Sequence, residues 1–121
     1  MNAQTPYDRT ITNWVDDIHK LAVTKGWWEE EREFGTLLML CVSELAEALE
    51  EYRAGHDPTY IYHEPAEDGF IKPEGIPIEL ADTIIRIFDM CGYYGIDIER
   101  AIGTKVQHNI NRAYRHGGKV V

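Results

Sequence analysis

Four carboxylates occur as two pairs, each spaced three residues apart, in two neighbouring stretches of the sequence. Glu44 and Glu47 lie in SELAEALEEYRAG, and Glu79 and Asp82 lie in IELADTIIRIFDMC. Side chains at positions i and i+3 share one face of an α-helix. Two such helices packed side by side would bring the four carboxylates together, and they would repel one another unless cations bound between them. Carboxylate oxygens suit Mg²⁺, which keeps coordination positions for water and phosphate oxygens.

The second of these stretches is apolar around most of its helical circumference. Its charged residues, Glu79, Asp82, Arg86 and Asp89, occupy one narrow arc. A helix that is apolar nearly all round is buried, in its own domain or in an oligomer. Charged groups in such a place must be paired or coordinate a metal. An ExxE pair on an exposed helix is common and does not by itself indicate a metal site, so the prediction depends on the combination of both pairs.

Basic residues gather near the end of the sequence. Residues 1–99 hold all 21 acids and have a charge balance of −14, whereas residues 100–121 hold no acid and have a balance of +5. Lys105, Asn109 and Arg112 follow i, i+4, i+7 spacing and form one polar stripe. Such a stripe is usually a solvated face, but a surface helix normally carries acids for intrahelical ion pairs. A lysine, an amide and an arginine together suit the oxygens of a phosphate chain.

Length and composition favour one domain over residues 1–121. The hydrophobic content of 44% is enough for a core. There is no apolar run of about 18 residues that would span a membrane, and the first residues lack the apolar region of a secretory signal. Cys41 and Cys91 lie on apolar helix faces, which favours reduced thiols in a cytoplasmic protein. The net charge of −9 argues against general nucleic-acid binding.

Apolar periodicity predicts an all-α protein, a four-helix bundle with one long loop. The predicted helices span about 8–25, 33–54, 77 to 90–92, and 97–113. Asp97 is a suitable N-cap for the last of them. The insertion at 55–77 is rich in proline and glycine, and no pair of strands is expected there, although TYIYH could form a short extended piece. Loops of this length in small domains are often functional or disordered. We expect residues 115–121 to form a tail.

These motifs in combination carry a resemblance to a known family. SELAEALE, followed by IELADTIIRIFDMCGYYGIDIERAI and KVQHNINR, resembles the MazG-like all-α nucleoside triphosphate pyrophosphohydrolases, in the small stand-alone form of bacteria and phages. The resemblance covers about residues 14–115. It implies that Mg²⁺, with Mn²⁺ as a possible substitute, is bound by both carboxylate pairs, and that the protein is a homodimer or homotetramer. The metal ligands so implied are Glu44, Glu47, Glu79 and Asp82.

The same resemblance implies a set of substrate contacts. The candidates for the phosphates and the sugar are Arg86, Lys105, Asn109, Arg112 and Tyr114, and those for the base are His19 and Trp28, with Trp14 and Trp27 as further candidates. Trp14 falls on an apolar stripe, which favours a core position. Trp27 and Trp28 cannot both be buried against one surface, so at least one is a candidate for lining a cleft. His19 follows Asp16 at i+3, and a core or surface histidine is the alternative to a metal pair.

The implied reaction is Mg²⁺-dependent hydrolysis of a nucleoside triphosphate, or of its deoxy form, between the α- and β-phosphates. It gives the nucleoside monophosphate and pyrophosphate. Bound Mg²⁺ would polarise the α-phosphate and lower the pKa of a bound water. Glu47, or alternatively Glu44, would accept the proton of the attacking water. Lys105 and Arg112 would stabilise charge on the departing pyrophosphate.

Three alternatives accompany this interpretation. A non-catalytic helical module for oligomerisation or partner binding would also be acidic, but it would not need carboxylates on an otherwise apolar helix. A related pyrophosphohydrolase could act on phosphoribosyl-ATP, dUTP or dCTP. A di-iron carboxylate bundle would use Glu-x-x-His pairs, and the sequence contains none.

Overall fold

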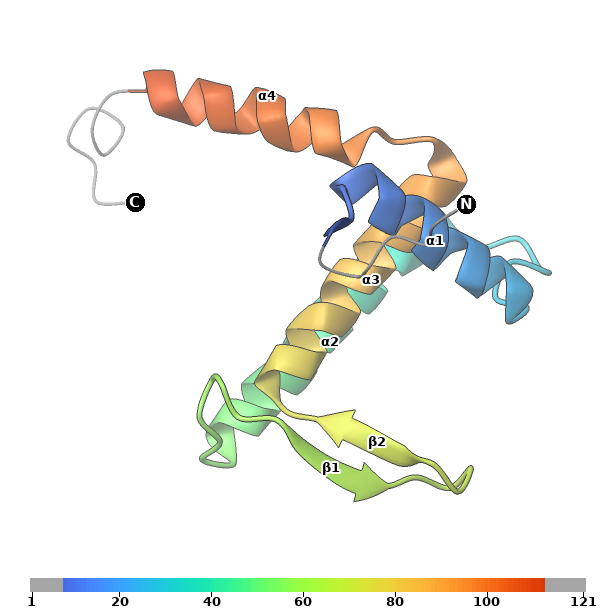
Figure 1. The fold of residues 1–121 in the computed structure, drawn as a ribbon, viewed down its shortest axis with the longest axis vertical. Coiled ribbons are helices and arrows are strands. Elements are labelled where there is room, and N and C mark those ends of the chain that lie inside the picture. Colours follow the sequence, from blue (N-terminus) through green and yellow to red (C-terminus); the bar gives the residue numbers. More distant parts are fainter. Residues whose placement is uncertain (1–7, 113–121) are drawn as a thin grey trace.

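The computed structural model describes residues 8–112 and is mostly helical, as the sequence predicts (Figure 1). Its elements in chain order are α1 (Ile11–Thr24), α2 (Phe34–Arg53), β1 (Tyr62–Pro65), β2 (Ile71–Glu74), α3 (Ile76–Tyr94) and α4 (Ile98–Asn111). Helices α2 and α3 run antiparallel side by side, and α1 packs across the C-terminal half of α3. Among the described residues, no helix is long and apolar enough to cross a membrane.

Polar side chains cap the helix starts. Thr10 accepts a hydrogen bond from the backbone N–H of Asn13, whose side chain accepts one in return, and this capping box begins α1. Glu33 caps α2 in a similar way. Asp97 caps α4 by accepting a hydrogen bond from the backbone N–H of Arg100 at 3.0 Å, so this predicted N-cap is confirmed.

Helix α3 continues past the predicted end at 90–92. It ends at Tyr94, and its C-cap Gly95 adopts the left-handed conformation (φ 68°) that commonly follows a helix. Gly92 lies inside the helix at the point where α1 crosses it. A Cβ atom at position 92 would lie only 2.5 Å from the Cβ of His19. Gly92 therefore allows two helices to approach closely and does not stop α3.

Replacing Gly92 with alanine should destabilise the protein by about 1–3 kcal/mol, because α1 must shift to make room for the new methyl group. The matched control is Gly103→Ala in α4, where an added Cβ meets nothing within 4 Å. That change should stabilise the protein by roughly 0.5–1 kcal/mol, since glycine is costly inside a helix. Thermal unfolding measures both effects. An increase in stability with both substitutions would contradict the close crossing of α1 and α3 at Gly92.

The insertion contains a β-hairpin, so the prediction that it holds no pair of strands is wrong. β1 and β2 pair antiparallel, with Tyr62 opposite Glu74 and Pro65 opposite Ile71. Pro73 in the middle of β2 argues against a strand in the sequence, because proline cannot donate a ladder hydrogen bond. In a hairpin of two strands each strand is an edge, so the missing N–H of Pro73 can face outward without cost to the ladder.

Helix α4 does not join α2 and α3 in a closed bundle. It projects away from them at the end of the molecule opposite the hairpin (Figure 1), and none of its residues is buried. Its main connection is Glu99, which accepts hydrogen bonds from the backbone N–H of Ile11 (3.1 Å) and the hydroxyl of Thr12 (3.0 Å). The predicted four-helix bundle is therefore not formed within one chain.

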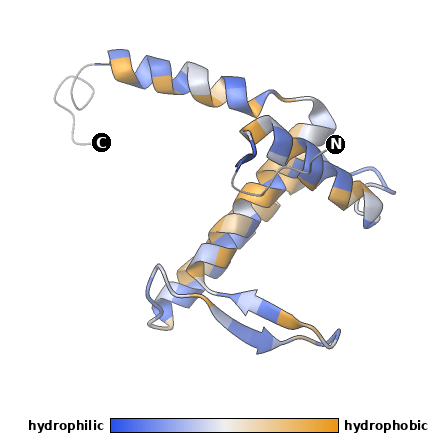
Figure 2. Cartoon of the chain, in the orientation of Figure 1, coloured by the Kyte–Doolittle hydropathy of each residue, from blue (hydrophilic) through white to orange (hydrophobic). Residues whose placement is uncertain are grey.

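The hydrophobic core of the described chain is small. It centres on Leu37, Cys41 and Met90 between α2 and α3. Cys41 and Cys91 are buried and free of disulfides, as predicted, and burial raises the pKa of both thiols. Hydrophobic residues recur along α2, α3 and α4 (Figure 2), and many of them are exposed. The exposed apolar residues of these helices include Leu38, Met39, Val42, Leu45, Leu49, Leu80, Ile84, Ile85, Ile102, Val106 and Ile110.

Candidate functional site

Three of the four predicted metal ligands converge between α2 and α3. Glu44, Glu79 and Asp82 each offer a carboxylate oxygen, and these oxygens lie within 4.8 Å of one another. All three side chains are half-buried. Glu47, the fourth predicted ligand, is exposed and lies outside this group. The antiparallel packing of the two helices thus positions one carboxylate from α2 against two from α3.

A second group of carboxylates adjoins the first and shares Glu79 with it. Glu51, Glu74 and Glu79 also offer oxygens within 4.8 Å of one another. Glu51 follows Glu44 by seven residues and therefore lies on the same side of α2. This spacing is visible in the sequence. Glu74 ends β2, and its position depends on the hairpin that the sequence did not predict.

The carboxylates disfavour one another's charge. Burial, together with a hydrogen bond to Glu44 and the negative charges of Asp82, Glu44 and Glu74, raises the pKa of Glu79 to about 7. Burial and the charge of Glu44 likewise raise the pKa of Asp82. A bound divalent cation would relieve this repulsion. The oxygen-only donor set fits Mg²⁺ or Mn²⁺ and lacks the imidazole and thiolate ligands that Zn²⁺ prefers.

The raised pKa of Glu79 predicts an unusual dependence of stability on pH. Between pH 4.5, the ordinary value, and about 7, the folded protein binds more protons than the unfolded chain. The free energy of unfolding should therefore fall as the pH rises through this range without divalent cations. Mg²⁺ should restore the stability that is lost by pH 7 and above, because the cation replaces the proton. Thermal unfolding with EDTA or Mg²⁺ tests this, and Glu79→Gln should weaken both effects.

A pocket of about 280 Å³ opens beside the first carboxylate group. It is lined by Trp27, Arg32, Glu44, Asp82, Ile85, Arg86 and Asp89. The Nε of Arg86 donates a hydrogen bond to Glu44 at 2.8 Å, so the predicted substrate-binding arginine lies directly at the carboxylates. Trp27 is 64% exposed. The pocket therefore combines carboxylates, two guanidinium groups and an accessible indole ring.

Asp89 holds two of the predicted base-contacting residues. It accepts a hydrogen bond from the Nε1 of Trp28 at 2.9 Å, and its carboxylate lies 2.8 Å from the Nδ1 of His19. Trp28 also stacks on Tyr93, with ring centroids 3.9 Å apart. His19 thus pairs with Asp89 and not with Asp16. Of the adjacent tryptophans, Trp28 is partly buried and Trp27 lines the pocket, as expected for one of the two.

The predicted phosphate-binding residues of α4 lie elsewhere in the chain. Lys105, Asn109 and Arg112 are exposed. They follow the C-terminal end of α3, whereas the carboxylates lie toward its N-terminal end (Figure 1). One chain therefore does not bring these residues to the carboxylate groups. Tyr114 lies outside the described residues. Trp14 is half-buried beneath the guanidinium of Arg9, 5.2 Å from the ring centroid, which favours a structural role.

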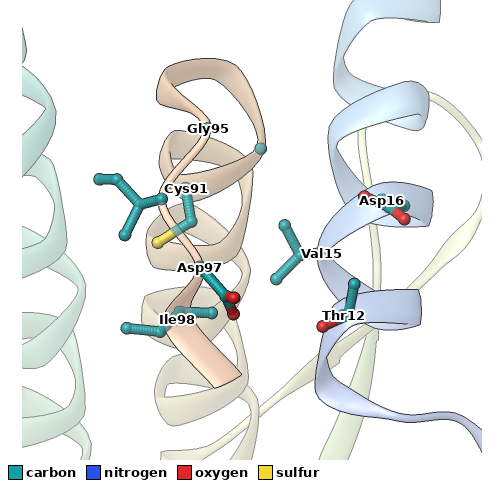
Figure 3. A pocket seen from close by; sticks show the side chains of 9 residues that line it. Thr12, Val15, Asp16, Cys91, Gly95, Asp97 and Ile98 are labelled. Carbon is teal, nitrogen blue, oxygen red and sulfur yellow. The ribbon is translucent and has the colours of Figure 1, made fainter. Parts of the chain in front are cut away.

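A second hollow, of about 210 Å³, lies between α1 and the turn that joins α3 to α4 (Figure 3). Thr12, Val15 and Asp16 line one side, and Cys91, Gly95, Asp97 and Ile98 are among the residues on the other. The carboxylate of Asp97 is engaged in capping α4. Within residues 8–112, the two groups with metal-ligand geometry both lie between α2, α3 and β2, away from this hollow.

No family model, curated protein or solved structure matches this chain. The assignment of a function therefore depends on the geometry of the site. Half-buried carboxylates from two helices, arginines and an exposed indole could bind a divalent cation together with a phosphate-bearing, aromatic ligand.

Proposed function

We propose that this protein hydrolyses nucleoside or deoxynucleoside triphosphates to the monophosphate and pyrophosphate, with Mg²⁺ held by Glu44, Glu79 and Asp82. The supporting observation is the convergence of these three half-buried carboxylates beside a pocket that contains Arg32 and Arg86. The resemblance of the ExxE and ExxD segments to MazG-like pyrophosphohydrolases is the second support. Buried, free cysteines are compatible with a cytoplasmic location, which we propose for the protein.

The residues of the pocket have distinct roles in this proposal. Bound Mg²⁺ would supply Lewis-acid activation of the phosphate and of a water. Arg86 and Arg32 bind phosphate oxygens, since guanidinium groups match their geometry. Trp27 stacks on the base. Glu47 is exposed and uncommitted to the ligand group, so it accepts the proton of the attacking water, with Glu44 as the alternative.

A second copy of the chain completes the site in this proposal. Helices α2, α3 and α4 expose large apolar side chains that a single chain leaves uncovered, and patches of this kind mark interaction surfaces. The exposed stripe of α4 is basic, whereas the carboxylate groups are acidic. Packing α4 of one copy against α2 and α3 of another would cover apolar surface and bring Lys105 and Asn109 to the phosphates. The assembly would be a homodimer or a dimer of dimers.

A non-catalytic oligomerisation module is the second candidate function. The extent of the exposed apolar surface favours it. It would bind Mg²⁺ no better than other acidic proteins do, and it would not need arginines beside the carboxylates. A pyrophosphohydrolase specific for phosphoribosyl-ATP, dUTP or dCTP would share the proposed site and differ in the contacts to the base and sugar.

The proposed function is tested by incubating the protein with each common NTP and dNTP, and with phosphoribosyl-ATP, in the presence of Mg²⁺. Monophosphate and pyrophosphate should form, and EDTA should prevent the reaction. Chromatography separates the monophosphate from the diphosphate. Diphosphate products would show that a different bond is cleaved, and the absence of any product would favour the oligomerisation module.

A further inference from the structure

We propose that Asp89 determines which base the pocket accepts. Its carboxylate accepts a hydrogen bond from an exocyclic amino group of the base, and His19 and Trp28 hold the carboxylate in position. This inference rests on the proposed function and deepens it, because it names the class of nucleotide that the site selects. That class comprises the nucleotides whose base carries an amino group on its pairing edge, such as those of cytosine and adenine.

The Asp89 carboxylate is fixed by side chains from two other parts of the chain. The Nδ1 of His19, in α1, lies 2.8 Å from Oδ1, and the Nε1 of Trp28, in the loop before α2, donates a hydrogen bond to the same oxygen at 2.9 Å. The Asp89 side chain is only 13% exposed. Asp89 lines the pocket of about 280 Å³, whereas His19 and Trp28 do not. Both residues therefore contact the carboxylate from outside the pocket.

The second oxygen of Asp89 retains the capacity to bind a ligand. Its polar contacts within residues 8–112 are the Nε1 of Trp28 at 3.2 Å, the longer branch of a shared hydrogen bond, and the Nη1 of Arg32 at 3.9 Å, which is beyond hydrogen-bond distance. An ionised carboxylate has about four acceptor positions and no donor. Oδ2 can therefore accept a hydrogen bond from an N–H group in the pocket, and it repels carbonyl and phosphate oxygens.

Trp28 itself has no ring face to offer to a base. Tyr93 stacks on one face, with centroids 3.9 Å and planes 8° apart, and the guanidinium of Arg32 lies over the ring, 5.0 Å from its centroid. These two groups cannot share one face, so both faces are covered. Trp28 thus acts on a ligand through Asp89. The ring of Trp27 lines the pocket and is 64% exposed, so it is the indole on which a base can stack.

The position of Asp89 along α3 suits a base whose phosphates lie at the cation site. Asp89 follows Asp82 by seven residues, so it lies on the same side of α3 and about 10 Å further along the helix. Arg86 lies between them on the same face, where it can bind phosphate oxygens. A nucleotide with its phosphates at Asp82 and Arg86 therefore extends its base toward Asp89.

The chemistry of a carboxylate determines which bases it favours. Aspartate and glutamate accept hydrogen bonds from the N4 amino group of cytosine, and adenine carries a similar amino group at N6. Thymine and uracil instead present a carbonyl oxygen at position 4, and hypoxanthine presents one at position 6. Two acceptors cannot form a hydrogen bond with each other, so Asp89 should discriminate against these three bases.

Calorimetric titration with dCMP and dUMP, and with dAMP and dIMP, measures this selectivity in the presence of Mg²⁺ and without hydrolysis. In at least one pair the parental protein should bind the amino-bearing nucleotide about 10-fold more tightly, the scale of a hydrogen bond to a charged group. Asp89→Asn should abolish most of this preference, because an amide also presents a donor. The matched control, Asp16→Asn, makes the same change at an exposed residue outside the pocket and should preserve the preference.

A second matched pair tests the positioning of Asp89. Trp28→Phe keeps a ring that can stack on Tyr93 but removes the Nε1–H donor, and it should lower the preference roughly 3-fold. Tyr93→Phe removes a hydroxyl that has no hydrogen-bond partner among residues 8–112 and should leave the preference unchanged. Electron paramagnetic resonance with Mn²⁺ should show parental metal affinity in all four variants.

Several results would overturn the inference. These are equal binding within both pairs or tighter binding of the carbonyl-bearing nucleotides by the parental protein, no binding of any of the four, and parental selectivity in Asp89→Asn or Trp28→Phe. A joint loss of selectivity and Mn²⁺ affinity in Asp89→Asn would also overturn it, because that would show a general structural effect. Selective binding by a parental protein that hydrolyses no triphosphate would contradict the proposed function alone.

Discussion

Asp82→Ala should lower Mg²⁺-dependent hydrolysis of dNTPs by at least about 100-fold, the scale of losing one group that stabilises transition-state charge. Asp82 lies with Glu44 and Glu79 in the group of converging oxygens, so its removal leaves the proposed cation with one of its two ligands from α3. Steady-state kinetics with a saturating dNTP and varied Mg²⁺ measure the loss. The same variant should unfold at a higher temperature in EDTA, because burial and Glu44 disfavour the charged form of Asp82.

Glu67→Gln is the matched control for this loss. It also removes one carboxylate, but Glu67 is exposed in the turn of the hairpin and belongs to neither carboxylate group. Its turnover and melting temperature should equal those of the parental protein. Parental turnover in Asp82→Ala would refute the metal assignment, whereas equal losses in both variants would indicate a general effect of net charge.

The sequence predicts those parts of the molecule that depend on local spacing. The i, i+3 carboxylates and the apolar periodicity predicted the helices and the convergence of four carboxylates. Glu44, Glu79 and Asp82 do converge, whereas Glu47 lies outside the group. The N-cap at Asp97 depends on a side chain three residues from its partner, and it was also predicted. These features depend on residues that are close together in the sequence, and the convergence of the carboxylates requires in addition only that the two helices pack together.

Features set by distant contacts could not be predicted in the same way. The hairpin depends on pairing between Tyr62 and Glu74, and Pro73 argues against a strand in the local sequence. Glu74 could not be assigned to the carboxylate group without that pairing. In the sequence, Gly92 indicates the end of a helix. Its actual role, to allow α1 to cross α3 closely at His19, depends on the packing of the two helices.

The position of α4 is the largest difference from the sequence prediction. Its apolar periodicity indicates that one face is covered but cannot indicate which chain covers it. In the structure this face is exposed, with Val106 at 50% and Ile110 at 69%. The predicted roles of Lys105 and Asn109 therefore depend on the proposed second copy. This dependence can be tested by mixing variants that are each inactive alone.

Two inactive variants, Asp82→Ala and Lys105→Glu, should regain activity when they are mixed. If α4 of one copy serves the carboxylates of the other, a mixed dimer holds one site that carries both changes and one site that carries neither. Unfolding and refolding the two chains together at equal amounts should then restore about a quarter of the parental activity. Random pairing makes about half of the dimers mixed, and each mixed dimer holds one intact site out of two. The activity of each variant refolded alone is the baseline.

The matched control replaces Lys105→Glu with Glu79→Gln in the mixture. Glu79 and Asp82 belong to the same chain's carboxylate group, so every site would then carry one of the two changes and no activity should return. Recovery in the first mixture and not in the second would require Lys105 to act on the partner copy. An absence of recovery in both, with mixed dimers present by native mass spectrometry, would mean that Lys105 serves its own chain or no site. If Lys105 serves its own chain, α4 would have to move from the extended position described here, because that position separates Lys105 from the carboxylates along the length of α3.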